Sequence, residues 1–382
     1  MTEAAVMSRA GLDELVAALI AEGYRVIGPT VRDDAIVLAE LESGAQLPSG
    51  WGVDSAPGRY RLRRRADEAV FGHSAGSQSW KEFLHPPQQL LWSADGDGFT
   101  PARPEAVRYA FLGVRACDLA AIATLSVVLG GGAHPAHPDG GFARRREGLF
   151  VVAAGCTEPG GVCFCASMGT GPQPGPGYDL ALTERIDSGG HRFVVEVGSV
   201  AGERVLSGLT HRGATGAEVD EARDAVEAAS AHMGRQMPAV DLRQLLADSR
   251  ESPLWDLVAD RCLTCGNCTM VCPTCFCTTT RDSTDLTGEH AERSQHWASC
   301  FESDFSYLHG GSVRVSGASR YRQWITHKLS TWHEQFGSSG CVGCGRCIAW
   351  CPVGIDITAE AANLAELREA SSAGEDEPGE QF

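Results

Sequence analysis

Eight of the fifteen cysteines fall into one pattern that occurs twice in the second half of the chain. Each copy reads C-x2-C-x2-C-x3-C-P, the spacing of bacterial ferredoxins that hold two [4Fe-4S] clusters. In such proteins the fourth cysteine of each run ligates the other cluster. The spacing therefore predicts two ligand sets, which are Cys262, Cys265, Cys268 and Cys351 for the first cluster and Cys341, Cys344, Cys347 and Cys272 for the second.

Glycines lie inside both runs, at Gly266, Gly343 and Gly345. They let the backbone approach closely enough for its amides to hydrogen-bond to cluster sulfurs. Paired C-x2-C motifs also build structural zinc sites, which is the competing interpretation. Zinc would leave four of the eight thiols without a role and would not explain the proline after each run. Since neighbouring clusters pass single electrons, the pattern favours electron transfer.

Four further cysteines follow two predicted strands. Cys117 comes directly after an apolar segment at 108–115, and Cys156 follows another at 149–155, with Cys163 and Cys165 in the glycine-rich loop beyond. Because the carboxyl ends of parallel strands meet at one edge of a sheet, these thiols are expected to converge. Two interpretations stay open for them, a third [4Fe-4S] site and small buried hydrophobic residues.

Three cysteines remain after these sets. Cys275 and Cys277 repeat the Cys-Phe-Cys pattern of the upstream loop just after a predicted ligand, and either line the second cluster or contribute to the additional site. Cys300 stands alone, and a small buried hydrophobic residue is the expected reading of it.

The apolar periodicity predicts an α/β arrangement before residue 235. A helix is expected at 10–22, strands at 24–27, 34–41 and 193–197, and helices at 216–233 and 241–250. The segments 108–115, 118–129 and 149–155 read as strand, helix and strand, which suits a βαβ unit.

We therefore expect an α+β fold, with an N-terminal α/β domain and a C-terminal ferredoxin-like domain that holds two clusters and carries a long insert. The boundaries predicted are 1–235 for a docking domain that could also hold the extra cluster, 236–370 for the cluster domain, and 371–382 for a disordered acidic tail.

Composition excludes several classes of function. The net charge of −17 opposes binding to a nucleic acid backbone. No signal peptide is recognised, and the longest apolar run, around 119–132, is too short to span a membrane, so a cytoplasmic protein with reduced thiols is expected. No nucleotide-binding fingerprint is present. The match of 72–76 to the G-x-S-x-G hydrolase motif is read as a plain turn.

A local basic excess accompanies the second cysteine run. Its members either balance the negative charge of thiolate-bound clusters or are solvated helix residues, and both readings stay open. They are Arg314, Arg320, Arg322, His327, Lys328 and Arg346.

Five segments together resemble one known family. They are WKEFLHPP at 80–87, RACDL at 115–119, CTEPGG at 156–161 with CFCASMGTGP at 163–172, RYRQW at 320–324 and GCVGCGRCIAWCP at 340–352. This set is similar to the dicluster electron-transfer subunit of cytoplasmic nickel–iron hydrogenases, the sulfhydrogenase beta subunit. The corresponding electron-transfer subunit of anaerobic sulfite reductase is also similar. The resemblance runs from about residue 80 to 360, and the eight ferredoxin-type cysteines match it residue by residue.

The resemblance implies a non-catalytic electron-transfer subunit of a hetero-oligomeric oxidoreductase complex. Its implied partners are an NAD(P)H oxidoreductase subunit with FAD and a [2Fe-2S] cluster, and the small and large subunits of a nickel–iron hydrogenase. The alternative is the electron-transfer subunit of an anaerobic sirohaem sulfite reductase. The motifs do not indicate which enzyme is the terminal partner, nor whether NAD or NADP is preferred.

Overall fold

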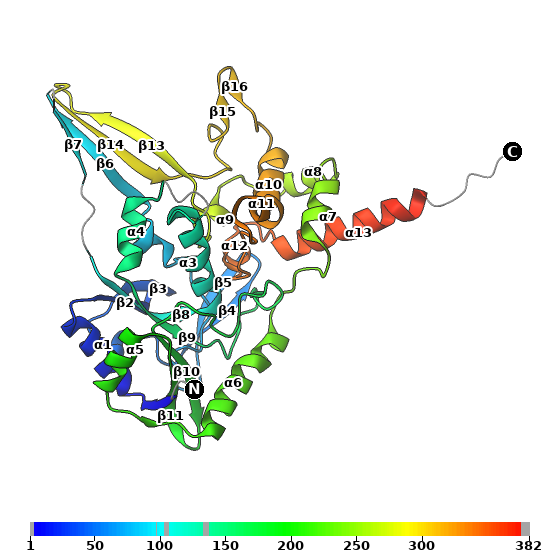
Figure 1. The fold of residues 1–382 in the computed structure, drawn as a ribbon. Coiled ribbons are helices and arrows are strands. Elements are labelled where there is room, and N and C mark those ends of the chain that lie inside the picture. The colour runs from blue at the N-terminus through cyan, green and yellow to red at the C-terminus, as the bar shows by residue number, and fades with distance from the viewer. Residues whose placement is uncertain (1–3, 97, 103–106, 133–136, 376–382) are drawn as a thin grey trace.

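The N-terminal part of the chain folds around one mixed eight-stranded sheet (Figure 1). The computed structural model describes residues 4–96, 98–102, 107–132 and 137–375. Four neighbouring strands, β10, β9, β8 and β2, run parallel, and antiparallel strands complete both sides. In spatial order the strands are β12 (Arg212–Gly213), β1 (Ala5–Ser8), β11 (Gly190–Val197), β10 (Leu180–Asp187), β9 (Phe150–Ala154), β8 (Tyr109–Arg115), β2 (Arg25–Arg32) and β3 (Ala35–Glu40).

Helices cover both faces of this sheet. Successive side chains of a strand point to opposite faces, so Ala110 and Leu112 enter one apolar core while Phe111 enters the other. A strand buried on both faces is a nearly continuous apolar run, as β8 is from Ala110 to Val114. The first core takes α1 (Gly11–Ala21) and α5 (Val200–Ser207), and the second takes α2 (Lys81–Leu84), α3 (Ala116–Leu129) and α4 (Gly140–Glu147). Helix α6 (Gly216–Ala229) packs on β1 and β11 through Ala222.

A second sheet joins segments from both halves of the sequence. Strands β6 (Gln88–Asp95) and β7 (Gly98–Pro101) pair with β14 (His290–Trp297) and β13 (Thr278–Thr284) in the order β13-β14-β6-β7. All of these pairings are antiparallel, and the sheet projects from the body as a long arm (Figure 1). The insert between the two cysteine runs thus supplies half of this arm.

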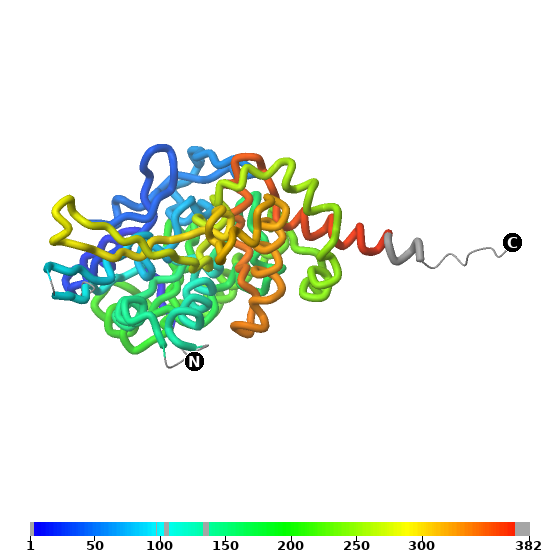
Figure 2. Tube along the Cα trace, turned by 90° about the horizontal axis from the view of Figure 1, so that it is seen from above, coloured from blue at the N-terminus to red at the C-terminus, as the bar shows by residue number. Residues whose placement is uncertain are grey.

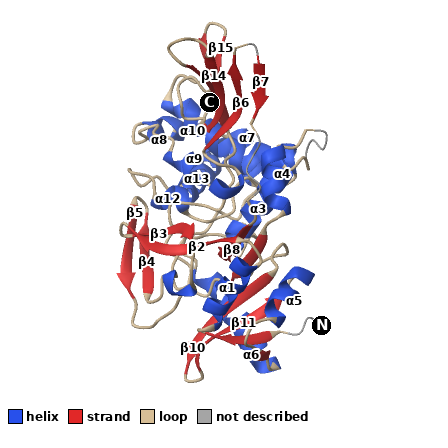
Figure 3. Cartoon of the chain, turned by 90° about the vertical axis from the view of Figure 1, so that its left-hand side faces the viewer, coloured by secondary structure: helices blue, strands red, loops and turns tan. Residues whose placement is uncertain are grey.

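The C-terminal part is a compact group of short helices. Figure 3 shows it between the two sheets, and Figure 2 shows its last helix running outward from the body. Its apolar core gathers Trp255, Phe301, Tyr321 and Trp324. Its helices are α7 (Leu242–Asp248), α8 (Leu254–Ala259), α9 (Asn267–Met270), α10 (Gly317–Thr326), a π-helical turn at His327–Thr331, α11 (Trp332–Phe336), α12 (Arg346–Ala349) and α13 (Ile357–Glu375).

Two small hairpins and two 3-10 turns complete the described chain. The hairpins are β4 (Trp51–Ala56) with β5 (Arg59–Arg64), and β15 (Tyr307–Leu308) with β16 (Gly311–Ser312). The turns span Gly44–Gln46 and Ser230–His232.

The structure confirms the predicted α+β class and the βαβ unit, which is β8-α3-β9 with parallel strands. The segment 72–76, read as a turn, contains no helix or strand. Helix α13 continues to Glu375, so 371–375 are helical where disorder was expected, and 376–382 lie outside the described residues. Within the described ranges no helix combines the length and apolar character needed to cross a bilayer.

Contacts cross the boundary predicted at 235/236, and they include a shared sheet and a shared apolar core. Strand β14 pairs with β6 along seven residue pairs, and Val162 and Phe164 belong to the apolar core of the C-terminal part. The two parts therefore share a sheet and a core, although each has its own set of elements.

Candidate iron–sulfur sites

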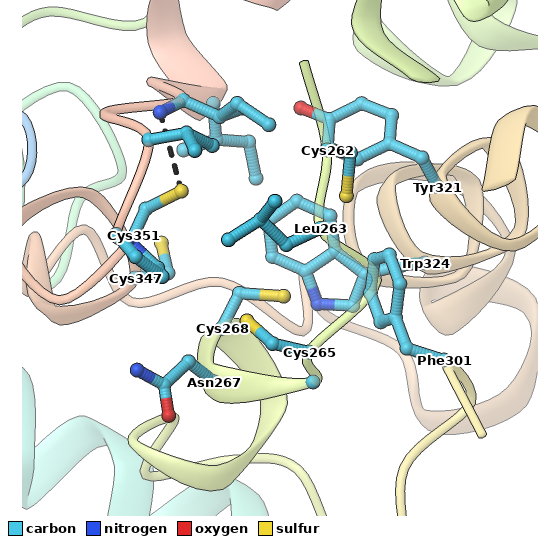
Figure 4. Close-up of a pocket in the computed structure, with 15 residues that line it drawn as sticks. Cys262, Leu263, Cys265, Asn267, Cys268, Phe301, Tyr321, Trp324, Cys347 and Cys351 are labelled. Atoms are coloured by element: carbon cyan, nitrogen blue, oxygen red, sulfur yellow. Dashed lines mark hydrogen bonds between the residues drawn. The ribbon is translucent and has the colours of Figure 1, made fainter. Parts of the chain in front are cut away.

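Five thiols from the two cysteine runs line one cavity. Figure 4 shows Cys262, Cys265 and Cys268 on one side of it and Cys351 on the other. The rest of the lining is almost entirely apolar and includes Trp324. Cys265 is exposed to solvent, so this cavity lies at the surface of the molecule. Four of these five thiols, Cys262, Cys265, Cys268 and Cys351, are the set predicted for the first cluster.

The other predicted set lines a second cavity. Its lining includes Cys272, Cys341, Cys344 and Cys347, together with the side chain of Lys328. Cys272 and Cys341 are buried, unlike the exposed Cys265 of the first cavity. Each cavity thus receives three cysteines from one run and the last cysteine of the other.

The two cavities adjoin, because Cys268, Cys347 and Trp324 line both. The neighbours of each shared thiol show where it belongs. Burial raises the pKa of Cys268, as does the charge of its nearest thiols, which are Cys300, Cys262, Cys351 and Cys265. Burial likewise raises the pKa of Cys347, and its nearest thiols are Cys341, Cys344, Cys272 and Cys268. Three of the four thiols named for Cys268 are its predicted partners in the first set, and three of the four named for Cys347 are its predicted partners in the second.

Backbone amides point at the thiol sulfurs, as the glycines inside the runs predict. The amide of Thr264 donates to Sγ of Cys262 at 3.4 Å, and that of Gly343 donates to Sγ of Cys341 at 3.5 Å. Both donors stand two residues after the first cysteine of a run, so the two loops share one conformation. Donors to a ligand sulfur stabilise its negative charge and tune the potential of a cluster.

The separation of these thiols bears on which metal they suit. Among the residues described, no three histidine, cysteine, aspartate or glutamate side chains converge as one metal ion requires. A zinc ion holds its four ligands about 2.0–2.3 Å from a single centre. The thiols of each predicted set line a cavity, and the cysteine ligands of an iron–sulfur cluster surround such a space. An all-thiol donor set with amide donors to sulfur fits a [4Fe-4S] cluster at each site.

The four upstream cysteines meet at the carboxyl edge of the eight-stranded sheet. Arg115 at the end of β8 is paired with Ala154 at the end of β9, and Cys117 and Cys156 each follow two residues later. Burial raises the pKa of Cys163 to about 12, and the nearest thiol charges contributing to this shift are Cys156 and Cys344. Burial also raises the pKa of Cys165, and the charges of Cys163, Cys156 and Cys344 raise it further. For Cys117 burial is again the largest cause of a raised pKa, and Cys165 and Cys344 are the thiols that contribute. The predicted group therefore gathers beside Cys344 of the second cavity.

The upstream loop is pinned onto the second cysteine run. The amide of Phe164 donates to the carbonyl of Gly343 at 2.9 Å, and the hydroxyl of Thr170 donates to the carbonyl of Val342 at 2.7 Å. A Cβ at Gly343 would lie 2.6 Å from the backbone of Cys165, and its φ of +64° also favours glycine. This glycine serves close packing between loops, a role that the cysteine spacing does not show.

A buried ion pair fixes the same junction from the other side. Arg346 of α12 donates to both carboxylate oxygens of Asp118 at 2.8 and 3.0 Å, and each side chain is 3% exposed. The guanidinium also donates to the carbonyls of Gly76 and Gln78. Asp118 follows Cys117 directly, so this pair ties the RACDL segment to the second cysteine run.

The lysine side chains at the second cavity are only partly predictable from the sequence. Lys328 is 3% exposed and contacts Sγ of Cys272 at 3.2 Å, whereas Lys81, equally buried, belongs to no cysteine motif. Burial alone would lower the pKa of Lys328, but the thiolate charges of Cys272 and Cys275 outweigh it and raise that pKa. Of the other basic candidates, Arg320 donates to three backbone carbonyls and Arg322 donates to one.

Cys275 and Cys277 lie on the Cys272 side of the second cavity. A hydrogen bond from Cys275 lowers the pKa of Cys272, against the effect of burial. Burial raises the pKa of Cys277, and the charges of Lys328 and Lys81 oppose this rise. Cys275 thus lies next to Cys272, which lines the second cavity.

Comparison with known proteins agrees with this arrangement. Residues 261–355 match the family described as the 4Fe-4S dicluster domain. Sulfhydrogenase 2 subunit beta of Pyrococcus furiosus is 30% identical over 279 residues, which cover 72% of this chain and 79% of that protein. No solved structure matches the chain. With its paired thiol cavities and this relative, the chain belongs to the family of sulfhydrogenase beta subunits.

Proposed function

We propose that this chain relays single electrons between an NAD(P)H-linked flavin subunit and a nickel–iron hydrogenase module. The observation that carries the proposal is the pair of adjoining thiol-lined cavities, one buried and one with an exposed thiol. When bound, [4Fe-4S] clusters supply one-electron transfer without bond chemistry. The chain's own residues then have to hold the clusters, set their potentials and place them near partner subunits.

The ligand assignment belongs to this proposal. Cys262, Cys265, Cys268 and Cys351 hold one cluster, and Cys341, Cys344, Cys347 and Cys272 hold the other. A third cluster is held by Cys117, Cys156, Cys163 and Cys165, and its proximity to Cys344 supports a row of three sites. In that order the third site and the exposed Cys265 stand at opposite ends, with the second cluster between them.

The proposed partners follow from the relative and from the family. The relative is named as a sulfhydrogenase subunit, which favours a hydrogenase at the terminal position over the sirohaem sulfite reductase alternative. The electron donor or acceptor at the other end is a subunit with FAD and a [2Fe-2S] cluster. Unpaired thiols throughout the chain suit a cytoplasmic complex.

Iron and acid-labile sulfide in anaerobically purified chain test the cofactor part. We expect about twelve irons per chain with three clusters and about eight with two. Cys156→Ser should remove about four irons and Cys344→Ser a different four, whereas the matched control Cys300→Ser should remove none. Colourless, iron-free protein would contradict the relay role altogether.

The partner part is tested by what co-purifies with a tagged chain from its natural host under anaerobic conditions. A nickel-containing large subunit and a flavin subunit are the expected companions. A sirohaem protein in their place would overturn the hydrogenase assignment while leaving the electron-transfer role intact.

A further inference from the structure

Lysine occurs at only two positions of this chain, 81 and 328, against thirty arginines. Surface charge is therefore carried by arginine wherever a cation is needed. The two lysines are both 3% exposed, although lysine is rarely buried without a partner. Both lysines lie in the same surroundings, which account for their burial.

Both ammonium groups lie on the Cys272 side of the second cavity. Lys328 donates to Sγ of Cys272 at 3.2 Å, to Oγ1 of Thr274 at 3.1 Å and to the carbonyl of Gly340 at 3.1 Å. An ammonium has three donors, so these three contacts use all of them. Gly340 precedes Cys341, and Lys328 thus joins the two segments that bring Cys272 and Cys341 to one site.

Lys81 forms the outer member of the pair. Its Nζ donates to the carbonyl of Cys275 at 3.0 Å and lies 3.6 Å from the ring centroid of Trp297. Neither contact supplies a negative charge. Burial lowers the pKa of Lys81, and the charges that oppose this effect are those of the thiols of Cys275, Cys272 and Cys277. A buried cation requires such a counter-charge.

The first cavity has no such cation among its described lining residues. That lining is cysteine, apolar and aromatic side chains with Gly266 and Asn267, and water reaches it at the exposed Cys265. Arg346, near Cys344 of the second cavity, is already balanced by Asp118. Net positive charge is therefore concentrated at the second site, on its Cys272 side.

We propose that Lys81 and Lys328 are the counter-charges of the second cluster and that Lys328 raises its reduction potential above that of the first. This inference rests on the proposed function, because it requires the clusters to be present. A thiolate-ligated cluster is anionic and each electron adds a negative charge, so a fixed cation stabilises the reduced form more than the oxidised form. One electron entering the chain then resides at the second site before it leaves through the first.

Lysine suits this position better than arginine. The ammonium is a compact point charge that fits between a sulfur, a hydroxyl and a carbonyl, whereas a guanidinium is a wide planar fork. The π-helical turn at His327–Thr331 sets Lys328 toward the cavity, and such turns recur at functional sites. The geometry thus explains why position 328 is lysine, in a chain whose other basic residues are almost all arginine or histidine.

Potentiometric titration followed by electron paramagnetic resonance tests the potential. In the unmutated protein one reduction step is expected for each of the two clusters held by the cysteine runs. Lys328→Met should shift the higher step to lower potential and leave the other unchanged, and Lys328→Arg, which keeps the charge, should shift it less. An unchanged titration in Lys328→Met with both clusters present would overturn the assignment.

An isotope experiment detects the contact in the unmutated protein, and two variants assign it to a residue. Protein grown with lysine labelled at Nζ with ¹⁵N carries label at only two side chains. Pulsed electron paramagnetic resonance of the reduced protein should show ¹⁵N coupling to one cluster, lost in Lys328→Met and retained in Lys81→Met. Absence of coupling beside normal cluster signals would refute the inference alone, whereas absence of cluster signals would refute the proposed function.

Discussion

Arg346 and Asp118 show how a single pair of side chains supports the cluster sites. Their two contacts of 2.8 and 3.0 Å form a bidentate pair, and the other guanidinium donors are satisfied by carbonyls of the 76–78 segment. Removing one member of a buried pair leaves the other charged and unpaired, which costs about 3–5 kcal/mol. The pair therefore holds the junction between α3 and α12.

Asp118→Asn is expected to lower the stability of the holo-protein by about 3 kcal/mol, because it leaves Arg346 without its counter-charge. The midpoint of thermal unfolding measures the loss. Asp54→Asn is the matched control, since Asp54 and Arg59 form a pair with both side chains 54% exposed and such pairs contribute about 0–1 kcal/mol. Equal effects of the two substitutions would contradict the role given to the buried pair.

Glu82 gives the protein a pH dependence. Burial raises its pKa to about 7, against the opposing charges of Lys81 and Arg346, and its Oε1 has no hydrogen-bond partner among the described residues. An unfolded glutamate has a pKa near 4.5, so the folded state binds this proton more tightly. The associated stability is complete below pH 4.5 and is lost as the pH rises through 7.

Glu82→Gln should therefore match the unmutated protein near pH 5 and become more stable than it as the pH rises past about 7. Glutamine is neutral throughout and removes the cost of burying a carboxylate. Melting temperatures across this range provide the comparison. Glu289→Gln, at an exposed position, is the control: its melting temperature should differ from that of the unmutated protein by the same amount at every pH. The same pH-independent difference for Glu82→Gln would show that burial does not raise the pKa of Glu82.

At the scale of elements, the contact between the upstream loop and the second cysteine run depends on Gly343. Its φ of +64° disfavours other residues, and a Cβ there would lie 2.6 Å from the backbone of Cys165. Gly337 has a similar φ of +75°, but a Cβ added there would meet no described atom within 4 Å. A substitution at Gly337 therefore measures the cost of the backbone conformation alone, whereas one at Gly343 adds the cost of the steric clash with Cys165.

Gly337→Ala is expected to cost about 1 kcal/mol, the usual penalty of a left-handed conformation for alanine. Gly343→Ala should cost more and should also lower iron content, because the loop that covers the second cavity must move. Iron per chain together with the melting temperature distinguishes the two effects. Full iron content in Gly343→Ala would mean that the loop contact does not support the second site.

The cysteine spacing predicted the grouping around both cavities because ligand geometry is local to each run. Strand and helix 108–129 were also predictable, since an apolar strand followed by a helix is a local signal. The pairing of β6 with β14 was not, because it joins residues about 200 positions apart and neither strand is strongly apolar. The position of Lys81 was hidden for the same reason: only the fold brings it to Cys275, although the scarcity of lysine is visible in the sequence.

At the scale of the whole molecule, the N-terminal part covers the second cluster site while leaving the first at the surface. Phe164 is fully buried and lines the second cavity, and it comes from the loop after β9. The first cavity takes its lining from residues 262–357 alone. The two sites therefore depend differently on the N-terminal part, even though their cysteine runs are equivalent in sequence.

This difference predicts how residues 236–375 behave when produced without the rest of the chain. They should retain at most about four of the roughly eight irons expected for the two clusters of the cysteine runs, since the first cavity is complete within them and the second loses the wall that Phe164 supplies. Phe164→Ala in the full chain tests the same wall without truncation, with a stability loss of about 3–5 kcal/mol and selective loss of the second cluster expected. Eight irons in the shortened chain would instead show that residues 236–375 fold and load independently, so that the shared sheet and core are not required for either site.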